Sequence, residues 1–230
     1  GKAGQIAAAG TEQFLSPVAV SYDVSRRRLY VADTILNKVF VLDEKGRSLG
    51  TRLPPDGYRR PGALAVDGQG RLLVLDLLGG WIASFDGEGQ YIRRIEGVFD
   101  GMPLNRPTGL WVDGRGQIYV VDAMNFRVVV LGPNGEFIRA IGSLGDAPGH
   151  FARPRGVAVD SAGHVYVTDA AFDNVQVFDA EGRLLLHWGG AGDKAGRFSL
   201  PAGVCIDAHD RLYVADSYNR RIQVFQYLAQ

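Results

Sequence analysis

The stretch that decides the fold is PRGVAVDSAGHVYVTDAAFDNVQVFDAEGRLLLHWG, residues 154–189. It contains four short runs rich in Val, Leu, Tyr and Phe, at residues 154–160, 164–169, 174–179 and 183–189. Gly, Asp and Asn bound these runs, and none of them has helical spacing over a useful length. The pattern is typical of four consecutive antiparallel strands joined by tight turns.

The same pattern recurs five times along the chain. Each copy has a proline three residues after an apolar one, at Phe14-x-x-Pro17, Tyr58-x-x-Pro61, Leu104-x-x-Pro107, Phe151-x-x-Pro154 and Phe198-x-x-Pro201. An aspartate closes the second run of each copy, at Asp33, Asp76, Asp122, Asp169 and Asp216. Successive prolines are 44, 46, 47 and 47 residues apart. Four strands in a repeat of roughly 40–50 residues form one blade of a β-propeller.

The sequence therefore predicts an all-β fold, a closed β-propeller of four-stranded antiparallel blades. We expect one domain over residues 1–230, with blades at about 14–53, 58–97, 104–142, 151–189 and 198–227. The last copy lacks a fourth run, and residues 5–10 align with Phe137–Gly142, a fourth run of the third copy. This alignment predicts that the N-terminal strand completes the last blade and closes a ring of five blades, with six blades as the alternative.

The repeat resembles the NHL repeat over essentially the whole chain. The resemblance is clearest at residues 107–131 and 201–225, where Asn125-Phe126-Arg127 and Asn219-Arg220-Arg221 follow the closing aspartates. The second copy departs from the motif with Leu77-Leu78-Gly79-Gly80-Trp81. The resemblance implies mainly interaction scaffolds, RNA-binding domains and sensor domains, usually with six blades. A few relatives are enzymes, among them an amidating lyase whose metal is held by histidines.

Bulk composition narrows the function classes. Lys plus Arg equals Asp plus Glu at 25 each, so the formal net charge of zero disfavours RNA as a partner without excluding a local basic patch. The single cysteine, Cys205, stands in an apolar run and is predicted to be a small buried residue. We expect neither a signal peptide nor a membrane-spanning segment in these residues, which leaves the compartment unknown.

The repeated polar residues are predicted to support structure and not chemistry. Each closing aspartate can accept N–H groups of the turn that follows it, as can the aspartates that begin the first hairpin turns. The four histidines, His150, His164, His187 and His209, occupy different blade positions and none lies on an innermost strand. The sequence therefore predicts no metal site, no cofactor and no catalytic residues.

The loops at one face of the propeller carry the predicted binding residues. Arg60, Arg106 and Arg153 precede the repeat proline in three successive copies, and Arg155 follows one of these prolines. Loops between the second and third strands of the blades add Leu77, Leu78, Trp81, Met124, Phe172 and Tyr218. Arginine among aromatic and apolar residues is typical of a binding surface. Pairing of the arginines with loop acids, and packing of the aromatics between blades, are the structural alternatives.

The function predicted from these observations is a non-catalytic scaffold, a monomer that presents one propeller face to a protein partner. Two alternatives stay open. One is a small-molecule enzyme of the propeller lactonase or lyase type, although inner strands such as residues 63–66 are apolar. The other is a single-stranded RNA-binding module, for which affinity would fall steeply with salt.

Overall fold

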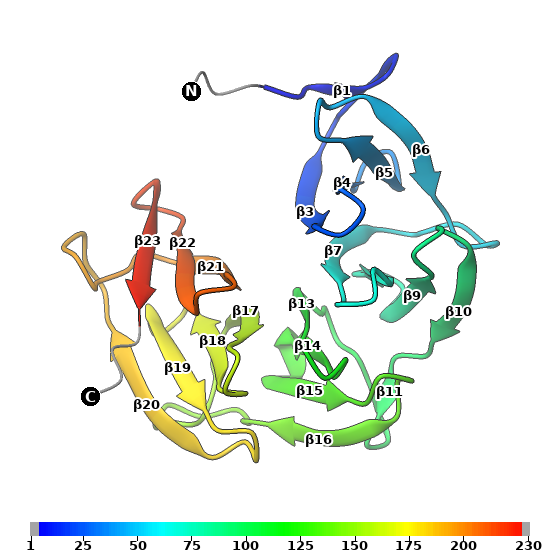
Figure 1. The fold of residues 1–230 in the computed structure, drawn as a ribbon. Coiled ribbons are helices and arrows are strands. Elements are labelled where there is room, and N and C mark those ends of the chain that lie inside the picture. The colour runs from blue at the N-terminus through cyan, green and yellow to red at the C-terminus, as the bar shows by residue number, and fades with distance from the viewer. Residues whose placement is uncertain (1–4, 227–230) are drawn as a thin grey trace. The chain divides into compact units, whose positions relative to one another are not determined.

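The structure, a computed structural model, describes residues 5–226 (Figure 1). These residues form five antiparallel sheets of three or four strands and two two-stranded hairpins, with almost no helix. Contacts divide the chain into two compact units, one up to Gly97 and one from Val98 onward. The first unit begins with the hairpin β1 (Ala8–Ala9) and β2 (Glu12–Gln13). Its first sheet consists of β3 (Pro17–Asp23), β4 (Arg28–Asp33), β5 (Lys38–Asp43) and β6 (Ser48–Arg52). Its second sheet consists of β7 (Pro61–Val66), β8 (Leu72–Asp76), β9 (Trp81–Phe85) and β10 (Tyr91–Ile95).

The second unit contains three sheets and one short helical turn. The hairpin β11 (Val98–Phe99) and β12 (Met102–Pro103) precedes the third sheet. That sheet comprises β13 (Gly109–Val112), β14 (Ile118–Asp122), β15 (Arg127–Leu131) and β16 (Phe137–Ile141), with the 3₁₀ turn η1 (Ala123–Asn125). The fourth sheet comprises β17 (Pro154–Val159), β18 (Val165–Asp169), β19 (Asn174–Phe178) and β20 (Leu184–Gly189). The fifth has three strands, β21 (Pro201–Ile206), β22 (Arg211–Asp216) and β23 (Arg221–Gln226).

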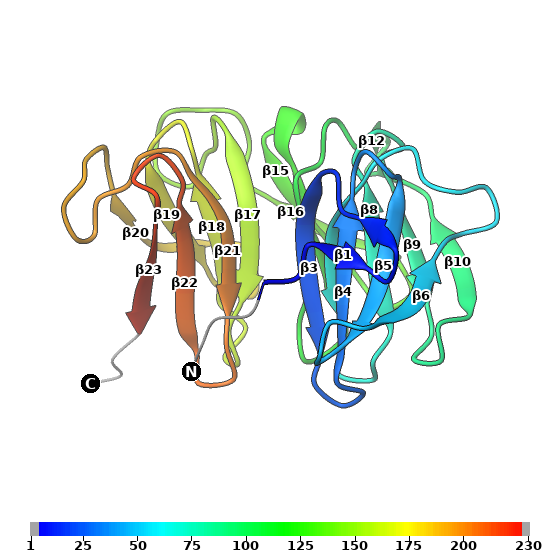
Figure 2. The same cartoon turned by 90° about the horizontal axis from the view of Figure 1, so that it is seen from above.

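Every sheet follows chain order, because each strand pairs antiparallel with its sequence neighbour through a short turn. The turn between β17 and β18 shows why the sequence folds this way. Asp160 Oδ1 accepts the N–H groups of Ala162 and His164 at 3.0 and 2.8 Å. Gly163 supplies the left-handed φ of 92° that the turn needs. The predicted propeller blades are confirmed, and connecting loops lie at both ends of the strands (Figure 2).

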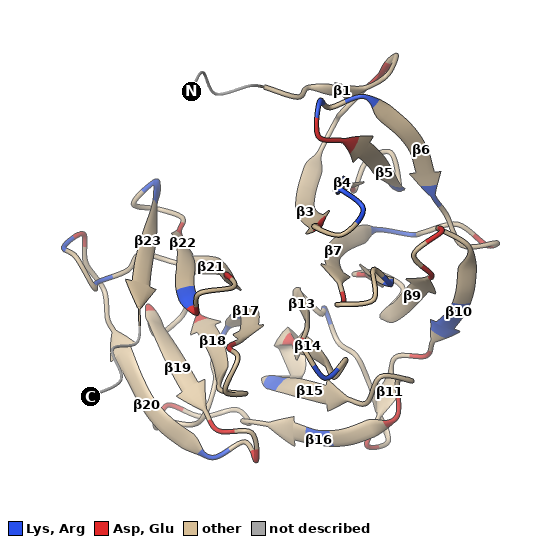
Figure 3. Ribbon diagram, in the orientation of Figure 1, with Lys and Arg blue, Asp and Glu red and all other residues tan. Residues whose placement is uncertain are grey.

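Within each unit, neighbouring sheets pack face to face. Tyr30 and Val41 of the first sheet form one apolar core with Leu72 and Val74 of the second. In the second unit, Tyr119, Val128 and Val130 of the third sheet pack against the fourth sheet. Tyr166, Val175 and Trp188 of the fourth sheet then pack against Leu212, Val214 and Phe225 of the fifth, and against Phe198 of the loop that precedes it. Charged residues lie mainly on loops and at strand ends (Figure 3).

Residues 5–10 and the last blade belong to different units, so their predicted pairing stays a prediction. Within the first unit, Ala8 and Ala9 pair with Gln13 and Glu12, and the Phe14 N–H donates to Ala7 O at 3.0 Å. Gly10, with a φ of 67°, turns the chain back on itself, and Ala9 is buried against the first sheet. A local hairpin needs less loop closure than a long-range pairing. Among residues 5–226, β23 pairs only with β22.

Cys205 also differs from its prediction, because it is exposed. Side chains alternate between the two faces of a strand, and Cys205 is opposite Tyr213 on the face of the fifth sheet turned away from the fourth. Ile222 and Val224, also exposed, lie on β23. No helix in residues 5–226 is long and apolar enough to cross a membrane.

Candidate functional site

The closing aspartates hold the loops of each repeat together. Asp33 Oδ2 accepts the N–H groups of Leu15 and Ser16 before β3, at 2.7 and 2.9 Å. Its Oδ1 accepts those of Ile35 and Leu36 after β4, both at 3.0 Å. All five of these aspartates are fully buried, and each binds the loop that precedes its own sheet. The structural interpretation of this set is confirmed.

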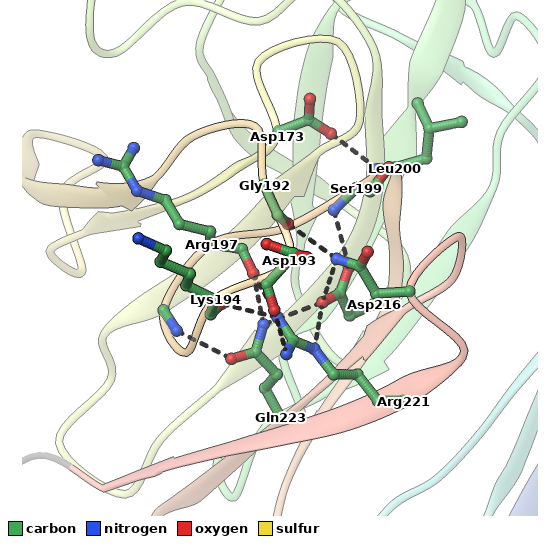
Figure 4. Close-up of polar contacts among 12 residues, drawn as sticks. Asp173, Gly192, Asp193, Lys194, Arg197, Ser199, Leu200, Asp216, Arg221 and Gln223 are labelled. Carbon is green, nitrogen blue, oxygen red and sulfur yellow. Dashed lines mark hydrogen bonds and ion pairs between the residues drawn. The ribbon is translucent and has the colours of Figure 1, made fainter.

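Two of the aspartates also pair with an arginine at the start of the third strand. Arg127 Nε donates to Asp122 Oδ2 at 2.9 Å, and Arg221 Nε donates to Asp216 Oδ2 at 2.8 Å. Asp216 additionally accepts bonds from Asn219 Nδ2, Gln223 Nε2 and the Ser199 N–H (Figure 4). Burial acts to raise the pKa of Asp216, but these hydrogen bonds outweigh it and hold that pKa below its usual range.

The predicted arginines are exposed: Arg60, Arg106 and Arg153 lie on loops, and Arg155 lies near the start of β17. Arg60 belongs to the first unit, whereas Arg106, Arg153 and Arg155 belong to the second. None of the four guanidinium groups forms an ion pair with an acid of residues 5–226. Arg153 binds the closing aspartate Asp169 through its backbone N–H and not through its guanidinium. That these guanidinium groups bind a partner stays a prediction.

The predicted apolar set does not form one exposed patch. Leu78, Met124 and Tyr218 are exposed, and Leu77 and Phe172 are half-buried. The prediction that Trp81 belongs to a binding surface is corrected by its burial. Its side chain is only 4% exposed and stacks on Tyr58, with ring centroids 5.8 Å apart. It is the first residue of β9, the position that Arg127 and Arg221 occupy in other sheets, and there it points inward. Trp81 therefore has no surface to offer a partner.

The structure contains a groove that the sequence did not reveal. It has a volume of about 450 Å³ and lies between the fourth and fifth sheets. Apolar side chains form most of its wall: Tyr166, Val177, Leu185, Leu186, Trp188, Leu212 and Phe225. Its polar lining consists of His164, Asp210 and Gln226. An apolar cavity with a few convergent polar groups is typical of a small-molecule site.

His164 is held at this groove by a carboxylate. Its Nδ1 lies 2.9 Å from Asp160 Oδ2, which also accepts a bond from Tyr166 OH at 3.0 Å. Its Nε2 has no hydrogen-bond partner within residues 5–226. A carboxylate on Nδ1 fixes the tautomer in which Nε2 can accept a proton. Beside it, Ser161 Oγ donates to Asp210 Oδ2 at 2.6 Å.

The equivalent turns between the first and second strands show what is unusual about His164. In the second and fifth sheets an arginine stands four residues after the turn aspartate, and its Nε donates to that carboxylate: Arg71 and Arg211. Gln117 has this place in the third sheet, and Arg47 and Arg183 make the arginine bond in turns between third and fourth strands. Histidine in this position keeps the turn and replaces a permanent cation with a group that can accept a proton. Sequence reasoning missed this site, although the replacement of arginine by histidine was visible. Within residues 5–226, no cluster of three or more His, Cys, Asp or Glu could hold a metal.

Comparison with protein families supports the resemblance seen in the sequence. Residues 198–225 match the NHL repeat, and residues 110–186 match a family described as a 6-bladed beta-propeller. No curated protein matches the chain.

Solved structures share the fold at low sequence identity. A streptogramin B lyase has a TM-score of 0.69 and 16% identity, covering 93% of this chain and 70% of its own. A virginiamycin B lyase from Staphylococcus aureus has a TM-score of 0.70 and 15% identity, and the match covers 96% of this chain and 73% of the lyase. A gluconolactonase from Xanthomonas campestris has a TM-score of 0.73 and 20% identity, and the match covers 93% of this chain and 73% of the lactonase. Another structure of the Staphylococcus aureus lyase is a catalytically inactive variant in which alanine replaces a histidine.

These neighbours contradict the predicted non-catalytic protein scaffold. They are propellers that act as lyases or as a lactonase. They agree better with the alternative of a small-molecule enzyme than with a protein-binding platform. The scaffold prediction took the apolar inner strands as evidence against catalysis. It did not consider polar side chains on the turns of a blade, such as His164, which contacts Asp160.

Proposed function

Because the chain is an NHL-repeat β-propeller, we propose that it is an enzyme acting on a small molecule in the groove between the fourth and fifth sheets. The observation that carries this proposal is the His164–Asp160 pair beside an apolar groove of about 450 Å³. The lyases and the lactonase that share the fold support the class of chemistry.

The substrate class follows from the wall of the groove. Trp188, Phe225 and Leu186 offer flat apolar surface for an aromatic or aliphatic group. Two of the polar lining residues, His164 and Asp210, belong to hairpin turns of the fourth and fifth sheets. We therefore place the reacting bond of the substrate at the end of the groove formed by these turns. A cyclic or linear ester with one apolar arm satisfies both requirements.

His164 is the proposed general base. Its neutral imidazole takes a proton from water at Nε2 while the water oxygen bonds to the ester carbonyl carbon. The carbon–oxygen bond of the ester then breaks, and the proton passes from the imidazolium to the leaving alkoxide. Asp160 holds the ring and stabilises the imidazolium through Nδ1.

The test is hydrolysis of a panel of lactones and aryl esters by the wild type, His164→Gln and His209→Gln. His209 is the matched control, an exposed histidine whose ring contacts no acid in residues 5–226. We expect kcat/KM to fall by about 10²–10⁴ in His164→Gln and to stay within twofold in His209→Gln. Thermal melts check that both variants fold. Equal rates in the wild type and His164→Gln, or no turnover of any ester by the wild type, would overturn the proposal.

A further inference from the structure

The fifth sheet ends at an unpaired strand edge. Each of the first four sheets has four strands, whereas β23 pairs only with β22 among residues 5–226. β23 therefore forms the outer edge of its sheet (Figure 1). Such an edge offers a row of backbone N–H and C=O groups to another extended chain.

The fourth sheet shows which backbone groups of a third strand face the fourth strand. Asn174 of β19 is opposite Gly189 of β20, and the Gly190 N–H donates to Asp173 O at 2.6 Å. This bond lies outside the Asn174–Gly189 pair, which is therefore of the non-hydrogen-bonded kind. Because the two kinds of pair alternate along a ladder, Val175 and the second residue after it direct their N–H and C=O groups toward β20.

Ile222 and Val224 have the same places in β23, 47 residues after Val175 and Val177. Their backbone N–H and C=O groups therefore point away from β22, toward the free edge. Their side chains are 60% and 54% exposed, whereas those of Val175 and Val177 are 0% and 4% exposed. Both the backbone edge and the apolar surface beside it are thus accessible in β23.

The fourth strands of the other sheets show which side chains such an edge accepts. In three of these strands, a large apolar residue is opposite the equivalent of Phe225, and a second one, four residues later, is opposite the equivalent of Ile222. These pairs are Tyr91 and Ile95, Phe137 and Ile141, and Leu184 and Trp188. The first sheet differs, with Ser48 and Arg52 at the two places.

The groove between the fourth and fifth sheets lies where the first of these apolar residues would enter. Phe225 lines this groove of about 450 Å³ together with Leu186 and Trp188 of β20. In the second sheet, the ring of Tyr91 packs on that of Phe85, the equivalent of Phe225, with centroids 5.7 Å apart. A large side chain opposite Phe225 is therefore expected to fill part of the groove.

Residues 5–10 lack both of these apolar residues. In their alignment with residues 137–142, Gln5 stands at the first place and Ala9 at the second. Within the first unit, Ala9 is also buried against Phe40 and Leu42. The edge of β23 is therefore better matched by a strand from another chain than by these residues.

We propose that β23 binds an extended peptide segment of another polypeptide, which adds to the fifth sheet as an antiparallel fourth strand. The segment has a large apolar or aromatic residue opposite Phe225 and another four residues later, opposite Ile222. Its backbone pairs with the N–H and C=O groups of Ile222 and Val224. Binding does not depend on ester hydrolysis, although the first apolar residue of the segment would exclude a small ester from the groove.

The experiment titrates a synthetic peptide with the sequence of residues 136–143, EFIRAIGS, into the 230-residue chain. The control peptide carries Phe137→Ser and Ile141→Ser. Val224→Pro removes one N–H group from the free edge, where proline is tolerated, and Val224→Thr keeps that group on a side chain of similar shape. The readouts, taken without any ester, are Kd from fluorescence anisotropy and amide hydrogen exchange followed by NMR.

We expect the wild type and Val224→Thr to bind the peptide with the same Kd. The control peptide should bind at least about tenfold more weakly, because two large side chains are no longer buried. Val224→Pro should also weaken binding of the original peptide. At a peptide concentration about ten times Kd, exchange of the Ile222 and Val224 amides should slow about tenfold.

Equal binding of the two peptides, or equal binding by the wild type and a folded Val224→Pro, would overturn the proposal. If Val224→Pro does not melt cooperatively, the comparison of the two peptides decides. Ile222 and Val224 amides that exchange as slowly as the Gln223 amide before peptide is added would also overturn it. Sedimentation would then show whether the same chain or a second copy covers the edge. Since no ester is present, failure of this test leaves the proposed enzyme to its own test.

Discussion

The Arg127–Asp122 pair offers the sharpest test of how the repeats are held together. The side chains are 4% and 0% exposed, and Arg127 also donates to Phe99 O at 3.3 Å. Arg127→Met keeps the apolar stem and removes the guanidinium, which leaves the Asp122 carboxylate buried without its cation. Removing one partner of such a pair costs about 3–5 kcal/mol.

Arg221→Met is the matched comparison, since Arg221 makes the same bond from a side chain that is 32% exposed. Water reaches that aspartate more easily once the arginine is gone, so we expect a loss of about 1–2 kcal/mol. At roughly 2–4 °C per kcal/mol for a domain of this size, Arg127→Met should melt about 10 °C below the wild type. Arg221→Met should melt about 4 °C below it.

Urea unfolding followed by circular dichroism gives the free energies, and calorimetry shows whether the two units melt separately. An unchanged m-value confirms that the variants expose the same surface on unfolding. A loss below about 1 kcal/mol for Arg127→Met would refute the argument from burial. Equal losses in both variants would show that exposure of the arginine does not set the energy.

Three further predictions concern stability. Tyr58→Phe should raise the free energy of unfolding by about 1 kcal/mol, because the buried Tyr58 hydroxyl has no partner in residues 5–226. Tyr218→Phe, on the surface, should leave the free energy unchanged in the same urea titration. Gly156→Ala should cost about 1–3 kcal/mol, since its Cβ would lie 2.7 Å from Ala202 O, and Gly114→Ala, with open space around it, should not change Tm. The lowered pKa values of Asp33 and Asp216, where hydrogen bonds outweigh burial, mean that the folded state holds fewer protons than the unfolded one in acid. The stability that these two carboxylates contribute is therefore present above the ordinary carboxyl pKa and is lost as pH falls below about 4. Tm should drop between pH 7 and pH 3, and a constant Tm would contradict the lowered pKa values.

The blades could be predicted because their determinants are local. Pro154, Gly163 and Asp169 each fix a nearby turn or strand end, and these signals return at a constant period. The sequence was less informative where contacts beyond a single repeat decide the outcome. Residues 5–10 fit a fourth strand by pattern, and the local hairpin that turns at Gly10 and packs near Phe40 was not predicted. Trp81 departs from the repeat in sequence, yet its side chain fills an inward position that arginine fills elsewhere.

The candidate site could not be predicted because no single run contains it. The groove depends on Trp188 of one sheet and Phe225 of the next, whose rings lie 5.5 Å apart at 64°. Only the packing of two sheets brings such residues to His164. The sequence did contain one usable signal, a histidine at the position where the equivalent turns of the second and fifth sheets have Arg71 and Arg211. That histidine stands out only when the five repeats are aligned by strand register and each residue is compared with the residues at the same position in the other repeats.

The same comparison by register explains how side chains can vary between repeats while the fold is kept. In each sheet, backbone N–H groups already hold the closing aspartate, so the residue paired with it can change from Arg127 to Asn174 while the loop stays in place. In most hairpin turns an aspartate likewise holds backbone groups, although Gly132 begins the turn between β15 and β16, so His164 can stand where other turns have arginine. The backbone bonds maintain the blade, and the side chain four or five residues after an aspartate is free to vary. Binding and catalytic groups are therefore expected at those two positions before any others in the repeat.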